Sequence, residues 1–317
     1  PTVIDKKIAI AIGNFDGVHK GHVKLLEAVK LKAHEDNLAF GVVTFDPHPR
    51  DFFSSKKSSF KLLDRQEKEY QLAKIGVEYL IIIEFSEELK NCTANEFLLD
   101  ILYKQLNVVK MFAGSNFRFG KNREGTIKNS KEFSQSIGLE ISAVDLAQTR
   151  SLNIKDETVI SSQSIRGLIS DGELETASKL LGRNWCVTGI VKKGKQQGRE
   201  LGFPTANVDM DYFLKPPLGV YVTKVKMIDQ KMNETSNDWL PSISNIGKRP
   251  TVSGENINIE THVIDFENHG DTNLYDKRIK VVLLKFLRQE IKFSSLLELK
   301  KQIGIDKQKA KNFHKLK

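Results

Sequence analysis

A ten-residue segment that would join a strand to a helix constrains the fold of this chain most. Residues 13–22 have the sequence GNFDGVHKGH and follow an apolar run, IAIAI, that is typical of a buried strand. Behind the segment, apolar residues between 23 and 31 recur at the spacing of a helix with one buried face. His19 and His22 are one helical turn apart, beside the free N–H groups of a helix N-terminus, which attract anions. The segment therefore predicts an α/β sheet whose edge binds phosphate.

The rest of the N-terminal half alternates between strand and helix signals. The predicted strands are residues 8–12, 39–45, 79–84, 108–113 and 139–144, and the predicted helices are 20–36, 64–75, 94–106, 130–135, 162–169 and 173–181. Such alternation is typical of a parallel sheet with helices on both faces.

The pattern changes after Gly182. Strand-like runs follow at residues 186–191, 220–227, 240–246, 257–266 and 279–287, and an amphipathic helix begins near Ser294. Several short strands and one terminal helix predict a small antiparallel β-barrel. A chain of 317 residues exceeds the usual size of a single core, so we expect two domains, residues 1–183 and residues 184–317.

Polar side chains gather where the strands of the first predicted domain end. The candidate ligand-binding residues just beyond a strand, or at the start of a helix, are Gly13, Phe15, Asp16, His48, Asn116, Arg118, Ser162 and Arg166. Prolines on both sides hold His48 rigidly, Asn116 offers amide donors, and Arg118 offers a guanidinium fork for phosphate. Because the carboxyl ends of parallel strands meet at one edge, we expect these residues to converge with His19 and His22.

The second predicted domain has a polar loop, residues 194–207, with the sequence GKQQGRELGFPTAN. Thr205 and Asn207 are two residues apart, so in extended backbone their oxygens face the same side and can both bind one Mg²⁺. Glu260 lies on a strand of alternating apolar residues, which puts its carboxylate on a polar or cavity-lining face. These residues predict a second site, with phosphate and metal as its ligands.

The segment GNFDGVHKGH resembles the HxGH signature of the nucleotidylyltransferase superfamily, in the form found in bacterial bifunctional riboflavin kinase/FAD synthetases. Further segments resemble that family in the same order, at residues 44–49, 112–120, 160–166, 194–207, 245–251, 260–262 and 288–293. The resemblance implies an α/β parallel-sheet nucleotidylyltransferase domain (Rossmann-like, HxGH), followed by a small antiparallel β-barrel with a C-terminal helix. It implies two reactions with ATP and Mg²⁺: riboflavin to FMN in the second domain, and FMN to FAD with release of pyrophosphate in the first.

The resemblance also implies a role for each candidate residue. In the first domain, the residues implied to bind or transfer the nucleotide are the catalytic His19 and His22, with Gly13, Phe15, Asp16, His48, Asn116, Arg118, Ser162 and Arg166 around them. In the second domain, Glu260 is implied to act as base or orienter at the ribityl hydroxyl, and Thr205 and Asn207 to hold Mg²⁺ and ATP. The other residues implied to bind ATP or flavin there are Gly194, Lys195, Gly202, Pro204, Glu290 and Phe293.

Two departures from the family pattern keep alternatives open. Gln163 stands where the family usually has threonine, and glutamines replace one glycine and one arginine of the loop before Leu201. A first alternative is an FAD synthetase whose second domain is impaired as a kinase and serves flavin binding or regulation. A second is an adenylyltransferase for a pantetheine- or nicotinamide-type phosphate, which the motifs of the second domain argue against. A third is a flavin- or RNA-binding regulator.

The composition narrows the class of protein further. The net charge of +9 suits phosphate-bearing substrates, and the lysines are dispersed, without an RNA-binding aromatic signature or zinc-finger spacing. No apolar run approaches the about 20 residues of a membrane span, and the N-terminus lacks the apolar core of a secretory signal. Cys92 and Cys186 lie outside any metal-ligand pattern. We therefore expect a cytoplasmic enzyme with small-molecule substrates and with neither nucleic acid nor membrane as partner.

Overall fold

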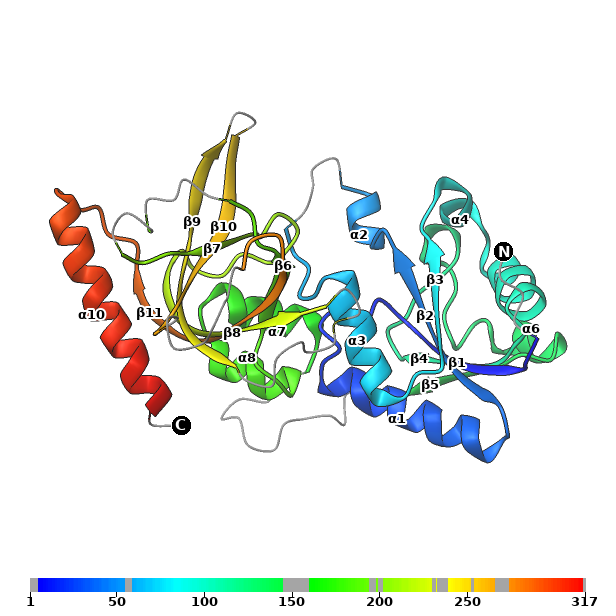
Figure 1. The fold of residues 1–317 in the computed structure, drawn as a ribbon. Helices are drawn as coiled ribbons and strands as arrows, with labels where there is room; N and C mark the ends of the chain where they lie inside the picture. Colours follow the sequence, from blue (N-terminus) through cyan, green and yellow to red (C-terminus); the bar gives the residue numbers. More distant parts are fainter. Residues whose placement is uncertain are drawn as a thin grey trace. The chain divides into compact units, whose positions relative to one another are not determined.

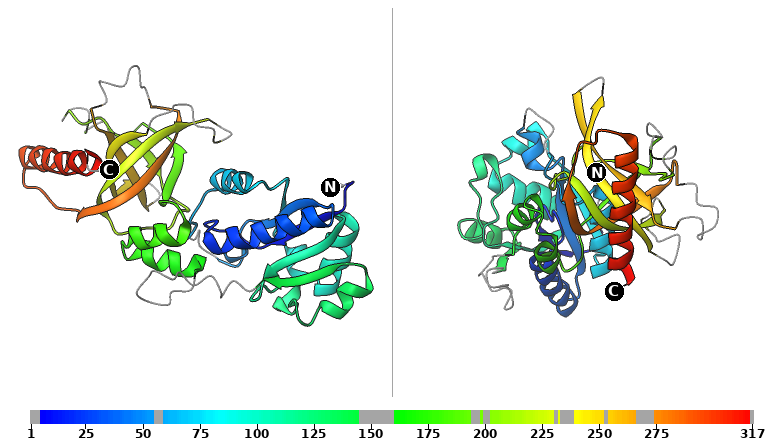
Figure 2. Two further views of the ribbon diagram at one scale, coloured as in Figure 1. Left: turned by 90° about the horizontal axis from the view of Figure 1, so that it is seen from below. Right: turned by 90° about the vertical axis from the view of Figure 1, so that its left-hand side faces the viewer.

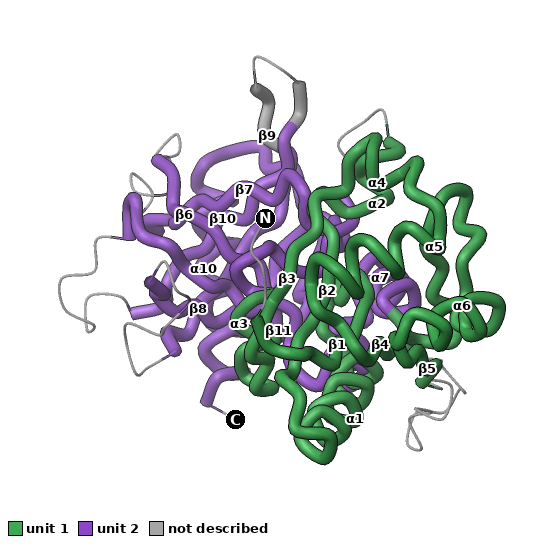
Figure 3. The backbone as a smooth tube through the Cα atoms, turned by 90° about the vertical axis from the view of Figure 1, so that its right-hand side faces the viewer, with its two compact units in different colours: residues 1–58, 68–161 green, residues 59–67, 162–317 purple. Residues whose placement is uncertain are grey.

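The computed structural model describes residues 5–54, 59–144, 160–193, 198, 202–229, 232, 239–251, 254–265 and 274–315. The chain divides into two compact units, residues 1–58 with 68–161 and residues 59–67 with 162–317 (Figure 3). Residues 162–183, which the sequence assigns to the first domain, group with the second unit. The domain boundary at residue 183 stays a prediction.

In the described residues, the first unit contains a five-stranded parallel sheet with the strand order β3-β2-β1-β4-β5 (Figure 1). Its strands are β1 (Ile8–Ile12), β2 (Ala39–Asp46), β3 (Tyr79–Glu84), β4 (Val108–Gly114) and β5 (Glu140–Val144). Every residue of the central strand β1 is buried, which agrees with its uninterrupted apolar sequence. All five predicted strands are confirmed, and so is the parallel α/β sheet.

The isoleucines of β1 pack into a core on one face of this sheet, together with apolar side chains of residues 97–106. The alanines of β1 alternate with them and face the other side, where helix α1 lies against the strand. The helical segments of this unit are α1 (Lys20–Glu35), α2 (Pro49–Phe52), α3 (Arg65–Ile75), α4 (Glu87–Asn91), α5 (Ala94–Glu96), η1 (Phe97–Gln105), η2 (Lys121–Arg123) and α6 (Lys131–Ser136). The first residues of α3, up to Glu67, belong to the second unit.

One predicted helix differs in its winding. Residues 94–106 form a short α5 that runs into η1, a π-helix, instead of a single α-helix. Its backbone bonds span five residues, as from the Leu106 amide to the Ile101 carbonyl at 3.1 Å. Phe97 and Leu102 are five residues apart and both lie in the core, an arrangement that the wider π-turn allows. The segments α2, α4 and η2 were not predicted because they are too short to show a helical period.

The second unit contains the six-stranded antiparallel sheet, in the order β6-β11-β8-β9-β10-β7. Its elements are α7 (Ser162–Ser170), α8 (Leu174–Leu181), β6 (Cys186–Ile190), β7 (Ala206–Asp209), β8 (Gly219–Ile228), β9 (Leu240–Thr251), β10 (Gly254–Val263), β11 (Arg278–Gln289) and α10 (Leu296–Lys315). A bridge between Lys192, two residues past β6, and Asn207 of β7 brings the two ends of the sheet together and nearly closes it into a barrel.

Helix α10 lies along the outside of this barrel (Figure 2), where Ala310 and Phe313 pack against apolar residues of β8 and β9. The predicted barrel with a C-terminal helix is confirmed. Strand β7 is absent from the predicted set because its four residues are too few to show an alternating pattern.

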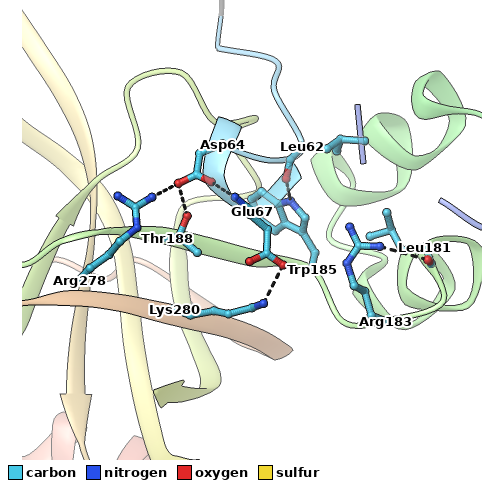
Figure 4. Close-up of polar contacts among 9 residues, drawn as sticks. All are labelled: Leu62, Asp64, Glu67, Leu181, Arg183, Trp185, Thr188, Arg278 and Lys280. Carbon is cyan, nitrogen blue, oxygen red and sulfur yellow. Dashed lines mark hydrogen bonds and ion pairs between the residues drawn. The ribbon is translucent and has the colours of Figure 1, made fainter. Parts of the chain in front are cut away.

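Buried charges attach the segment 59–67 to the barrel within the second unit (Figure 4). The Asp64 carboxylate accepts hydrogen bonds from Thr188 and Arg278, and its other oxygen accepts from the Glu67 amide at 2.7 Å. Glu67, which is only 1% exposed, forms an ion pair with Lys280 at 2.7 Å. Buried charges need such partners, so these contacts determine where the start of α3 lies on the barrel.

Candidate active sites

The predicted anion-binding turn folds tightly between β1 and α1. Phe15, Gly17 and Val18 have φ angles of 48°, 90° and 38°, a left-handed region that Phe and Val rarely adopt. The Val18 amide closes the turn on the Phe15 carbonyl at 3.2 Å, and the Gly13 amide binds the Val43 carbonyl at 3.1 Å. Strained backbone of this kind persists where packing holds it, and the side chains of Phe15 and Val18 are only 1% exposed.

The two histidines of the turn form a stacked pair at the start of α1. His19 is the N-cap residue, and its Nδ1 accepts a hydrogen bond from the His22 amide at 3.2 Å. The ring centroids are 3.6 Å apart with 14° between the planes, and the His22 ring also tilts against Phe15 at 5.1 Å. Because Nδ1 of His19 is an acceptor, the proton of its neutral ring is on Nε2. The turn thus holds two ordered imidazoles at the positive end of a helix.

Gly21 of the same motif is in close contact with this pair. A Cβ at this position would stand 3.1 Å from Nδ1 and 3.2 Å from Cε1 of His19, and 3.5 Å from the Ile160 carbonyl oxygen. A side chain there would therefore press on the imidazole. Asp16 is also buried in the turn, at 4% exposure.

The other predicted residues of the first unit follow the strands that flank β1. His48 comes after β2 and caps α2, with its Nδ1 accepting from the Arg50 amide at 3.0 Å. Asn116 and Arg118 lie in the turn after β4, where Asn116 is exposed. Since β1 lies between β2 and β4, their carboxyl ends are neighbours at the point where the strand order reverses, which is where open α/β sheets bind ligands.

An aromatic cluster at this edge was not predicted. Phe45, Phe52, Phe53 and Phe85 form ring pairs with centroids 5.1–6.2 Å apart. Phe53 is 63% exposed and stands five residues after His48. The only sign of this cluster in the sequence is the pair Phe52-Phe53, shortly after Pro-His-Pro. The pair alone does not indicate a ligand, because Phe85 comes beside it only through the order of the strands.

Ser162 and Arg166 are on α7, which groups with the second unit. The Arg166 Nε donates to the Phe60 carbonyl at 3.0 Å, and its guanidinium lies over the Phe60 ring at 5.1 Å. The implied role of both residues in phosphate binding stays a prediction.

Strand register assembles the candidate kinase site. Asn207 of β7 pairs directly with Glu260 of β10, and Glu260 pairs with Asn245 of β9. Directly paired residues project from the same face of a sheet, so the three side chains form a row. The Asn245 Nδ2 donates to the Glu290 carboxylate at 3.1 Å, and this contact adds Glu290, the residue just past the end of β11, to the row. Gly247 leaves room for the Glu290 carboxylate, because a Cβ at Gly247 would stand 2.4 Å from Glu290 Oε1.

The loop before β7 carries the other predicted residues. The Asn207 Nδ2 lies 3.4 Å from the Thr205 carbonyl oxygen, a contact that orients the amide. Gly202 has a φ of 86°, and Pro204 is exposed. Phe293 is half-buried between β11 and α10. Gly194 and Lys195 lie outside the described residues.

A parallel sheet with a paired-histidine turn, joined to an antiparallel barrel, defines a two-module protein of the HxGH nucleotidylyltransferase class. The family model for FAD synthetase matches residues 2–162, and the family model for riboflavin kinase matches residues 181–314. The chain belongs to the bifunctional riboflavin kinase/FMN adenylyltransferase family.

Relatives of that name match nearly the whole chain. The bifunctional riboflavin kinase/FMN adenylyltransferase of Escherichia coli (strain K12) is 36% identical over 304 residues, which cover 96% of this chain and 92% of the relative. That of Bacillus subtilis (strain 168) is 34% identical over 309 residues, with the same shares covered.

Among solved structures, a crystal structure described as a macrolide-efflux protein from Streptococcus pneumoniae is similar, with a TM-score of 0.79 and 29% identity. The match covers 98% of this chain and 96% of that protein. In the part of this chain that the structure describes, no helix has both the length and the hydrophobicity to cross a membrane.

Proposed function

We propose that this chain phosphorylates riboflavin to FMN in the barrel and adenylylates FMN to FAD, with release of pyrophosphate, at the edge of the parallel sheet. ATP is the second substrate of both reactions. The observation that carries the proposal is that one chain contains both the stacked pair of His19 and His22 and the directly paired Asn207 and Glu260. We also propose a cytoplasmic location, since both reactions consume ATP.

In the adenylyl transfer, a phosphate oxygen of FMN attacks the α-phosphorus of ATP, and the bond from that phosphorus to the pyrophosphate oxygen breaks. No covalent enzyme intermediate is needed, so positioning and charge stabilisation account for catalysis. His19 can donate from Nε2 to a phosphate oxygen because its Nδ1 is engaged by the His22 amide. Fixed donors of this kind stabilise the charge that develops in the transition state.

The aromatic cluster supports a place for the flavin ring. Phe53 offers an exposed aromatic ring at the end of α2, the short helix that His48 caps, on the sheet edge where the histidine turn also ends. Flat rings stack on such faces with ring centroids about 4.5–7 Å apart. We propose that the isoalloxazine ring of FMN contacts Phe53, with its phosphate toward His48 and the α1 N-terminus.

In the kinase reaction, the 5′-hydroxyl of riboflavin attacks the γ-phosphorus of ATP, and the bond from that phosphorus to the β,γ-bridging oxygen breaks to release ADP. The proton of the hydroxyl goes to a base. Glu260 is a suitable base or orienter because it is paired with Asn207, next to the loop proposed to bind nucleotide. The Thr205 hydroxyl and the Asn207 amide oxygen are hard oxygen donors, which fit Mg²⁺. Mg²⁺, when bound, neutralises charge on the ATP phosphates.

The test is to incubate the full chain with riboflavin, ATP and Mg²⁺ and to separate the flavins by chromatography. The proposal expects FMN to form first and FAD to follow. An FAD synthetase with an impaired barrel would make FAD only when FMN is supplied. A flavin-binding regulator would make neither product, and that result would refute the proposal.

A further inference from the structure

His262 makes a contact in the barrel that the proposed reaction does not explain. It lies two residues beyond Glu260 on β10, so both side chains project from the same face. His262 is 7% exposed, and its ring meets that of Phe203 edge-on, with centroids 5.4 Å apart and 83° between the planes. Its Nδ1 lies 3.0 Å from the carbonyl oxygen of Pro204. One imidazole therefore contacts two consecutive residues of the segment that leads into β7.

The contact with Pro204 determines the tautomer of His262. A carbonyl oxygen only accepts hydrogen bonds, so Nδ1 carries the proton and donates. In the neutral ring Nε2 is then an acceptor, and it has no hydrogen-bond partner among the described residues. Burial lowers the pKa of His262 and outweighs the hydrogen bond to Pro204, which raises it. The surroundings thus favour a neutral ring with one donor, directed at Pro204.

This hydrogen bond stands where the backbone ladder between β7 and β10 stops. β7 begins at Ala206, which pairs with Thr261. Thr205 precedes the strand, so the ladder does not hold the peptide group that joins Pro204 to Thr205. The His262 side chain attaches that peptide group to β10 instead.

We propose that His262 is a positioning residue of the kinase site, which holds the loop before β7 so that Thr205 and Asn207 present their oxygens to the metal–nucleotide substrate. The inference rests on the proposed kinase function of the barrel. His262 is assigned no contact with the transferred phosphoryl group. Loss of its Nδ1 donor should therefore impair the use of ATP and Mg²⁺ much more than the binding of riboflavin.

The test compares His262→Leu, which removes the donor, with His262→Asn, whose Nδ2 can take the place of Nδ1. In the full chain, KM is measured for ATP and for riboflavin, together with the Mg²⁺ concentration that gives half-maximal kinase activity. His262→Leu should raise the KM for ATP and the Mg²⁺ requirement by about 10–100-fold, as loss of a residue that orients a metal ligand does. The KM for riboflavin should change less than about threefold, and His262→Asn should restore most of the loss.

His314 provides a matched control in the same unit, since its Nε2 also contacts a backbone carbonyl, that of Thr223, at 2.9 Å. His314→Leu should lower the melting temperature without moving the KM for ATP. FAD formation from supplied FMN reports the amount of active chain in every variant. Equal changes in both KM values, or an Asn variant no better than Leu, would overturn the inference while leaving the kinase function intact. A wild-type chain that makes no FMN would refute the proposed function and the inference together.

Discussion

The two candidate sites are built in opposite ways. The paired-histidine turn of the first site is contained in ten consecutive residues, and its cap and ring stack are local contacts. The kinase site combines Asn207, Asn245, Glu260 and Glu290, which become neighbours only through strand register and the end of β11. A site made of local contacts forms whenever the strand and the helix on either side of it form. A site built from register depends on the whole barrel, because a slip of one residue would turn every side chain of a strand to the other face.

The largest expected effect tests the register-built site at its carboxylate. Glu260→Gln keeps the shape but removes the base, so kinase activity should fall by about 10²–10⁴-fold, the usual contribution of general base catalysis. FAD formation from supplied FMN should not change. Asp265→Asn is the matched control, because Asp265 lies just past β10 and forms an ion pair with Lys311 at 2.7 Å. Kinase activity within about threefold of wild type in Glu260→Gln would remove this residue from proton transfer.

A second prediction tests how far the barrel depends on its buried charges. Lys280→Met deletes the ammonium that pairs with the Glu67 carboxylate, which should cost about 3–5 kcal/mol of unfolding free energy. On heating, this variant should therefore lose kinase activity at a lower temperature than adenylyltransferase activity. Lys179→Met is the control, because its ion pair with Glu175 is at the surface and should contribute less than about 1 kcal/mol. Loss of both activities at the same temperature would contradict the contrast between the two sites.

The same contrast explains what the sequence could predict. The central strand β1 and the helix start at His19 follow from contiguous residues, and both were predicted. Strand β7 has only four residues and forms because β10 supplies its ladder, so no local pattern could identify it. The contact of Asn245 with Glu290 joins residues 45 positions apart. Such contacts depend on register, which hydrophobic alternation suggests only loosely in strands interrupted by polar residues.

A third prediction concerns the stacked pair. His22→Ala removes one donor for the developing charge, so adenylyl transfer should lose about 2–4 kcal/mol of transition-state stabilisation. FMN formation in the barrel should be unaffected, which makes the kinase an internal standard for folding. His34→Ala is the control, because His34 is exposed in the last turn of the same helix. If FAD formation in His22→Ala equals that of wild type, this histidine has no part in the chemistry.

The smallest expected effect comes from adding one methyl group to a helical glycine, either Gly21 beside the histidine pair or Gly304 on α10. Gly→Ala within a helix normally stabilises a protein by about 0.5–1 kcal/mol. At Gly304 on α10, an added Cβ would meet no atom beyond its own helix within 4 Å, so Gly304→Ala should raise the melting temperature and leave both activities unchanged. At Gly21 the same methyl would stand 3.1 Å from His19 Nδ1, and the ring must shift by a few tenths of an ångström.

Such a shift is smaller than the displacement of about 1 Å that can cost about 10²-fold in rate, so Gly21→Ala should slow FAD formation by about three- to tenfold. FMN formation should stay at the wild-type rate, because the barrel has no part in this turn. Steady-state rates for both products in the two alanine variants provide the measurement. A Gly21→Ala variant that is stabilised and fully active would mean that adenylyl transfer does not depend on the exact stacking of the two imidazoles. The histidine turn would then tolerate change as a surface helix does, and its rigidity could no longer account for catalysis by positioning.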